Sequence, residues 1–179
     1  MQQSMDEILN KAFERGKQHE MESGGCPQCT IAGIFDALGI ENDDVFRAST
    51  GLADGVGLTG DGHCGALSGG AMVISYLYGR KIEDFPKMMK LMRANILSKK
   101  LHDQFVEKYG TCRCVDIQKK LVGRFFNLYD PAEMEAAVKA GMMDKCSTLV
   151  GETARMATKI ILEERERESL EEKQGKAKV

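Results

Sequence analysis

Apolar residues recur every three or four positions along almost the whole of this 179-residue chain. That spacing places them on one face of an α-helix, whereas a half-buried strand would alternate apolar and polar residues. Glycine or proline residues stand at the ends of most of these segments, as is typical of helix ends. The pattern predicts an all-α bundle of seven or eight helices, over residues 5–23, 29–38, 43–48, 67–78, 84–109, 114–125, 131–140 and 146–161.

The length of the chain indicates one domain. On folding, a chain of this size buries roughly 70% of the surface that its unfolded form exposes. It can therefore fold around its own hydrophobic core without covalent cross-links. We expect a single helical domain over residues 1–165. Residues 166–179 are rich in charge and are expected to form a frayed tail.

Charge and hydropathy exclude several classes of protein. The formal net charge is −2 and no basic face stands out, which argues against nucleic-acid binding. The sequence contains neither an apolar run of membrane length nor a signal peptide at its first residues. We therefore expect no membrane partner and a cytoplasmic location, where thiols stay reduced and stable disulfides are rare.

A glycine-rich run surrounds Cys64. Eight of the twenty residues from 51 to 70 are glycine, which is typical of a main chain that turns sharply or approaches another group closely. The run delivers Cys64 to the start of an apolar helical segment. His63, beside it, is a candidate base, ligand or hydrogen-bond donor, and an ordinary polar loop residue is the alternative.

Five further cysteines accompany Cys64. Cys29, Cys64, Cys114 and Cys146 each fall at or near a predicted helix start, where the helix dipole favours a thiolate, although only modestly. A single cysteine is more often a small hydrophobic core residue. Four in equivalent positions favour a shared site. The other two cysteines, Cys26 and Cys112, are candidate accessory thiols.

Familiar nucleotide and redox motifs lack their structural context here. Two G-x-G-x-x-G strings, at 55–60 and 60–65, follow no predicted strand, so a dinucleotide role is disfavoured. The C-x-x-C at 26–29 also lacks the strand that precedes a thioredoxin-like pair. Thr30 stands where covalent haem attachment needs histidine, which excludes a c-type haem.

The cysteines and their neighbours resemble the C_GCAxxG_C_C family of redox-active proteins, common in anaerobic bacteria and archaea. The residues that carry the resemblance are Cys29, the run Cys64-Gly65-Ala66-Leu67-Ser68-Gly69, the run Gly110-Thr111-Cys112-Arg113-Cys114, and Cys146. The resemblance implies that Cys29, Cys64, Cys114 and Cys146 are the family's four cysteines and candidate metal ligands, with Cys26 and Cys112 as extras. A similar helical module occurs in split-Soret-type cytochromes, beside an iron–sulfur centre.

Our leading hypothesis is an iron–sulfur electron-transfer or redox-sensing protein carrying a [2Fe–2S] or [4Fe–4S] cluster. Cys64 and Cys29 would be its redox-reactive thiols, and Gly62, His63 and Gly65 would contact the cofactor. Such a protein is an electron carrier rather than a substrate-converting enzyme, and it needs a redox partner protein; a homodimer is a further option.

Two alternatives stay open. In a metal-free thiol–disulfide oxidoreductase, Cys26/Cys29 or Cys112/Cys114 would exchange with Cys64 or Cys146. In a structural or interaction domain, the same cysteines would bind zinc.

Overall fold

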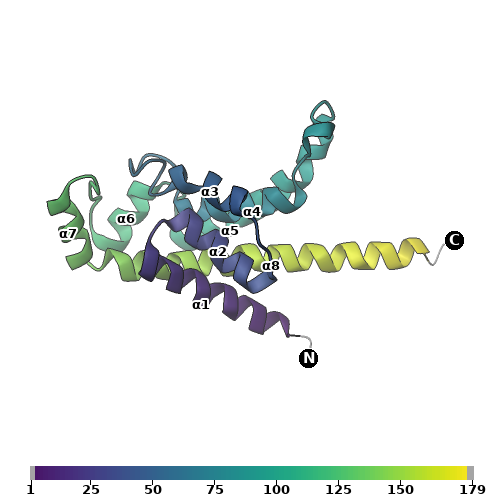
Figure 1. Ribbon diagram of the computed structural model, residues 1–179, viewed down its shortest axis with the longest axis horizontal. Coiled ribbons are helices and arrows are strands. Elements are labelled where there is room, and N and C mark those ends of the chain that lie inside the picture. The colour runs from purple at the N-terminus through teal and green to yellow at the C-terminus, as the bar shows by residue number, and fades with distance from the viewer. Residues whose placement is uncertain (1–2, 177–179) are drawn as a thin grey trace.

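The computed structural model describes residues 3–176 and confirms the all-α prediction (Figure 1). Eight α-helices and three short 3-10 turns account for its regular structure, and the described residues contain no strand. The α-helices are α1 (Met5–Ser23), α2 (Cys26–Leu38), α3 (Asp43–Ala48), α4 (Gly65–Tyr78), α5 (Met92–Tyr109), α6 (Cys114–Val122), α7 (Pro131–Lys139) and α8 (Met142–Lys176). The 3-10 turns are η1 (Thr50–Leu52), η2 (Ile82–Asp84) and η3 (Met88–Leu91).

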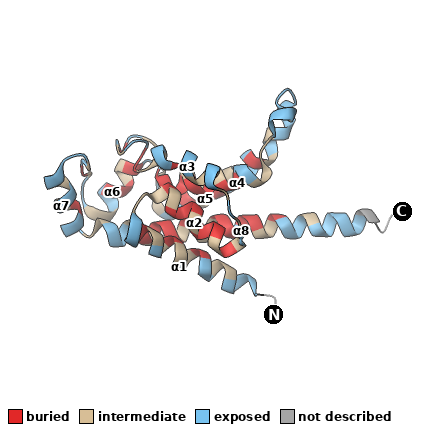
Figure 2. Ribbon diagram, in the orientation of Figure 1, coloured by how far each residue is buried: buried red, intermediate tan, exposed pale blue. Residues whose placement is uncertain are grey.

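The core lies where α1, α2, α4 and α5 pack around the first half of α8 (Figure 2). Its fully buried side chains include Ile31, Ile74, Leu101, Phe105 and Ile161, one or more from each helix except α1. Helix α1 contributes Ala12 and Gly16 to its buried face instead. Because α1 presents small residues, it approaches α2 very closely: a Cβ on Gly33 would lie 2.7 Å from the Cα of Gly16.

Helix α8 is longer than its apolar pattern indicates. It continues through Lys176, so residues 166–176, expected to be a frayed tail, are helical, while 177–179 lie outside the described residues. Beyond the core the helix is mostly exposed and extends past the rest of the protein (Figure 2). Ion pairs three and four residues apart support it there, since Arg167 pairs with both Glu164 and Glu171.

The expected helix over 84–109 begins later than its pattern suggests. Residues 82–91 form the turns η2 and η3, and α5 starts only at Met92. Pro86 explains the break, because it has no N–H to donate to a preceding carbonyl group and its ring would clash with the preceding turn of a continuous helix. As a result Met88 and Met89 are 72% and 76% exposed rather than buried.

No helix in residues 3–176 combines the length and the apolar character that crossing a membrane requires.

Candidate functional site: a buried cavity with four thiols

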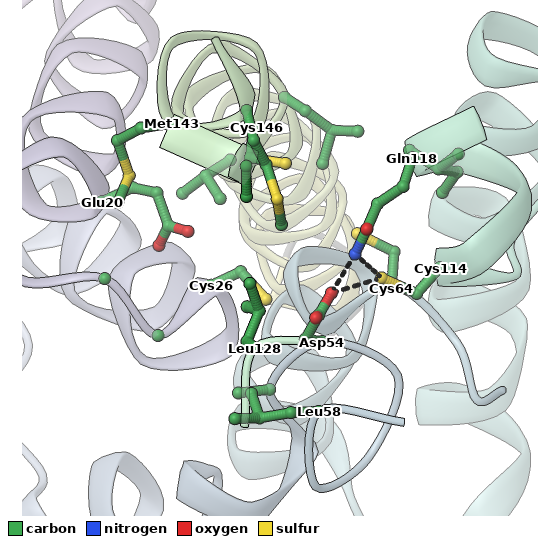
Figure 3. A pocket seen from close by; sticks show the side chains of 18 of the residues that line it. Glu20, Cys26, Asp54, Leu58, Cys64, Cys114, Gln118, Leu128, Met143 and Cys146 are labelled. Carbon is green, nitrogen blue, oxygen red and sulfur yellow. Dashed lines mark hydrogen bonds between the residues drawn. The ribbon is translucent and has the colours of Figure 1, made fainter. Parts of the chain in front are cut away.

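A cavity of about 260 Å³ lies where the starts of α2, α6 and α8 meet the glycine-rich loop and α7 (Figure 3). Most of its wall is apolar, with Leu58, Ile117, Leu128 and Val150 among the lining residues. Four of the six cysteines also line it, namely Cys26, Cys64, Cys114 and Cys146.

Main-chain pairing brings Cys64 and Cys114 to this cavity from distant parts of the sequence. The N–H of Cys64 donates to the carbonyl of Cys112 over 2.8 Å, and the N–H of Cys114 donates to the carbonyl of Gly62 over 3.0 Å. His63 and Arg113 form the antiparallel bridge between these contacts. This short ladder fixes the end of the glycine-rich loop against the start of α6.

The glycine-rich loop contains a left-handed turn. Residues Asp54, Gly55, Val56, Gly57 and Leu58 have consecutive φ values of 48°, 75°, 69°, 58° and 59°. Such angles are unusual for residues other than glycine, and a β-branched residue such as Val56 is a clear outlier. The turn places both Asp54 and Leu58 on the cavity wall, while Val56 is 51% exposed. Strained backbone of this kind tends to occur at functional sites.

Cys64 is the residue before the first turn of α4. The N–H groups of Ala66 and Leu67 point at its sulfur and lower the pKa of the thiol, but burial outweighs them and raises that pKa to about 12. Gly65 lets the start of α4 approach α2, because a Cβ at this position would overlap the sulfur of Cys26.

Cys26 and Cys29 lie in the first turn of α2 with different environments. The Cys26 side chain lines the cavity. Cys29 is buried but is not among the lining residues, and its thiol donates to the carbonyl of Gly24 over 3.0 Å. The structure therefore gathers Cys64, Cys114 and Cys146 of the four expected ligands around the cavity, and the position of the fourth on the wall is taken by Cys26 rather than Cys29.

The remaining candidate residues lie outside the cavity wall. Cys112 is half-buried, and its main-chain carbonyl group accepts the hydrogen bond from the N–H of Cys64. His63 is exposed. The carbonyl group of Gly62 accepts a hydrogen bond from the N–H of Cys114. Gly65 touches Cys26 and Pro27 rather than the cavity itself. Their expected contacts with a cofactor stay a prediction.

Sequence reasoning missed two carboxylates. Glu20 and Asp54 line the cavity and are only 6% and 7% exposed. Glu20 Oε2 and Asp54 Oδ2 are buried without a hydrogen-bond partner. For Glu20 a signal existed, because it continues the four-residue spacing of the buried positions Ala12 and Gly16 on α1.

Gln118 orients Asp54. Its Nε2 donates to Asp54 Oδ1 over 2.5 Å and lies 3.6 Å from the sulfur of Cys114. The thiol of Cys114 donates to the same oxygen, Asp54 Oδ1, over 2.9 Å. Both donors therefore bind Oδ1 and leave Oδ2 without a partner (Figure 3).

The electrostatics of the cavity oppose ionisation of its acids. Burial raises the pKa of Cys26, Cys114 and Cys146, and it also raises the pKa values of Glu20 and Asp54. The described residues that line the cavity include no lysine, arginine or histidine that could stabilise an anion. In the absence of a bound cation, the thiols keep their protons at neutral pH.

The sulfur and carboxylate oxygen atoms of these side chains surround the cavity and do not converge on one position. Within residues 3–176, no three His, Cys, Asp or Glu side chains converge closely enough to enclose one metal ion. The cavity between them is larger than a single ion needs.

The fold and the site define a helical protein in which four of the six cysteines and two carboxylic acids line one largely apolar cavity. A family model described as "Putative redox-active protein (C_GCAxxG_C_C)" matches residues 25–160, about three quarters of the chain. The chain belongs to this family, and its redox-active character follows from that membership. A search of curated proteins and a search of solved structures each found no match.

Proposed function

We propose that the cavity binds an iron–sulfur cluster and that the protein carries electrons or senses redox state through it. The observation that supports this proposal most strongly is the convergence of four thiols on one cavity without a basic side chain in its described wall. Membership of a redox-active family agrees with the proposal but does not specify a cofactor.

The donor set fits a sulfur-rich centre. Thiolates are soft ligands that select iron–sulfur clusters, copper(I) or zinc. The cavity of about 260 Å³ exceeds by many times the roughly 10–15 Å³ that one water-sized probe occupies. A cluster of several atoms suits donors spread around such a space better than a single zinc ion does.

Binding requires the thiols to lose their protons. Burial holds those protons in place when no cation is present, and a bound metal reverses the balance because it stabilises the thiolates. Metal-free thiol–disulfide exchange would need a thiolate at neutral pH, and the raised pKa values of Cys26, Cys64 and Cys114 oppose it. The same chemistry therefore favours a metal centre over metal-free exchange.

The bound cluster would supply one-electron transfer. The protein would supply the ligands Cys64, Cys114 and Cys146, with Cys26 or Cys29 as the fourth. The N–H groups of Ala66 and Leu67 already point at the Cys64 sulfur and would keep that contact when the thiolate forms. Hydrogen bonds to cluster sulfurs and exclusion of water by the apolar wall both tune a reduction potential.

The test is composition and spectroscopy of protein prepared without oxygen. We expect about two or four iron atoms per chain with matching acid-labile sulfide, as in [2Fe–2S] or [4Fe–4S] centres, and a visible absorption that bleaches on reduction. Unfolding the same sample in urea with a chelator should release the iron. A colourless protein without iron or sulfide, after anaerobic reconstitution with both, would overturn the proposal.

A further inference from the structure

We infer that Glu20 and Asp54 bind the metal centre through Glu20 Oε2 and Asp54 Oδ2, so that the cavity gives it mixed sulfur and oxygen coordination. The inference rests on the proposed function, because it adds oxygen ligands to the centre proposed for the same cavity.

Burial of the two carboxylates supports the inference. Each side chain is more than nine-tenths buried, and each has one oxygen without a partner. Buried polar atoms in native proteins are nearly always paired, so an orphan atom requires an explanation such as an ion. Both carboxylates face the cavity that the thiols line (Figure 3).

The protein fixes the orientation of each carboxylate with its other contacts. Two donors, the Cys114 thiol and Gln118 Nε2, hold Asp54 Oδ1. Glu20 lies near the Cys29 thiol of the neighbouring helix, which lowers the pKa of Glu20 against the larger effect of burial. For Asp54, the pairing of Oδ1 with the Cys114 thiol and Gln118 leaves Oδ2 unsatisfied.

The backbone at Asp54 helps to set the direction of its side chain. This residue begins the left-handed turn with a φ of 48°, a conformation that aspartate adopts more readily than most residues other than glycine. The turn places the carboxylate of Asp54 on the cavity wall.

A bound cation would balance the negative charge that these acids carry once they ionise. The described lining residues contain carboxylic acids and thiols but no basic side chain. Carboxylates that are buried as ions are paired with a cation or coordinate a metal. A metal centre with free coordination positions satisfies both oxygens, whereas a centre bound only by sulfur leaves them buried and unpaired.

X-ray absorption at the iron K-edge of anaerobic protein tests the inference directly. We expect an oxygen shell at about 2.0–2.2 Å in addition to sulfur at about 2.3 Å, distances typical of carboxylate and thiolate ligands of divalent metals. In the double variant Glu20→Gln/Asp54→Asn the oxygen shell should shrink, and iron affinity should fall at least tenfold. The matched controls are Glu22→Gln on the exposed side of α1 and Asp61→Asn on the exposed part of the same loop, which should keep the wild-type spectrum.

The outcomes separate the two proposals. Iron with sulfide and a purely sulfur environment in the wild-type protein would overturn the oxygen ligands and leave the proposed function intact. A wild-type protein that binds no iron would overturn both. Thermal unfolding of the metal-free forms controls for folding: an unchanged midpoint in the double variant, together with the loss of iron affinity, is the result expected of ligands. A lowered midpoint with an unchanged oxygen shell would assign the carboxylates a structural role and overturn the inference.

Discussion

Opposing effects act on the sulfur of Cys64. Two main-chain N–H groups at the start of α4 favour the thiolate, as the helix-start positions of the cysteines predict. Such a helix terminus contributes about 1 kcal/mol, less than one pKa unit, whereas full burial shifts a pKa by up to 3–5 units. Burial therefore dominates and the thiol is held in its neutral form. Under the proposed function, a bound metal ion rather than the helix would convert this thiol into a thiolate.

At the same scale, we expect Gly65→Ala to disturb the cavity. The new Cβ would overlap the Cys26 sulfur and lie 2.8 Å from Pro27 Cδ, so α2 or α4 must shift. The free energy of unfolding should fall by about 1–3 kcal/mol, as for other overpacked sites, and iron content should decrease. Urea denaturation and iron analysis measure the two effects. Gly51→Ala is the matched control in the same loop, since its Cβ would meet no atom within 4 Å. Equal stability of the two variants would contradict the close approach.

Among the elements, the left-handed turn over 54–58 contains the non-glycine residues with positive φ that are found in residues 3–176. Helix propensity and apolar spacing predict where helices lie, but they contain no information on where a glycine-rich loop turns left-handed or which way Asp54 points. The position of Asp54 depends on the ladder between residues 60–64 and 112–115, a contact between distant segments. That dependence explains why the helices, and the buried position of Glu20 on one of them, could be predicted from sequence while the place of Asp54 could not.

We expect Val56→Gly to stabilise the protein slightly. A left-handed conformation costs a residue with a Cβ about 1–2 kcal/mol, and the greater freedom of glycine in the unfolded chain offsets roughly half of that gain. The Val56 side chain is 51% exposed, so little packing is lost. The control is Ile96→Gly, at a 60% exposed position within α5, which should lose about 1 kcal/mol. Urea midpoints that fall equally in both variants would show that the turn is not strained.

The ion pairs of Glu164, one of which joins α8 to α5, are expected to weaken at low pH. Arg167 and Arg93 lower the pKa of Glu164 to about 2, through hydrogen bonds of 2.6 and 2.7 Å. Because the folded-state pKa lies below the ordinary value of 4.5, this stabilisation is present above pH 4.5 and is lost as the pH falls through 2. We expect Glu164→Gln to cost about 1 kcal/mol at pH 7 and progressively less at lower pH.

Urea midpoints at pH 7 and pH 3 measure this difference. Glu166→Gln, an exposed position on the same helix, should have little effect at either pH. A cost of Glu164→Gln that stays constant between the two pH values would contradict the ion-pair explanation.

At the scale of the whole molecule, we expect the hydrophobic core to fold whether or not the cavity holds a ligand. The core of α1, α2, α4, α5 and α8 is apolar and continuous, so we expect the protein to stay folded when the proposed metal centre is removed. Far-ultraviolet circular dichroism after chelation should keep its helical signal, with a lower thermal midpoint because a ligand that binds only the folded state stabilises it. Loss of the helical signal would mean that metal binding and folding are coupled, as in small zinc domains.

The thiol set itself could be predicted only in part. The helix-start positions predicted that Cys29, Cys64, Cys114 and Cys146 share a site, and the structure places the last three on the cavity wall. Cys26, expected to be an accessory thiol, lines the cavity in place of Cys29, because two residues three positions apart on a helix present different faces to their surroundings. That choice depends on how closely Gly65 lets α4 approach α2.

The central claim is that the cavity thiols hold a metal centre, and the most direct measurement is the iron content of single cysteine-to-serine variants reconstituted without oxygen. We expect Cys64→Ser, Cys114→Ser and Cys146→Ser to lose most of their iron. Cys112→Ser should keep it, since Cys112 lies outside the cavity wall and its main-chain contact with Cys64 survives the substitution. The pair Cys26→Ser and Cys29→Ser identifies the fourth ligand. Full iron content in Cys64→Ser, or equal loss in Cys64→Ser and Cys112→Ser, would contradict the account.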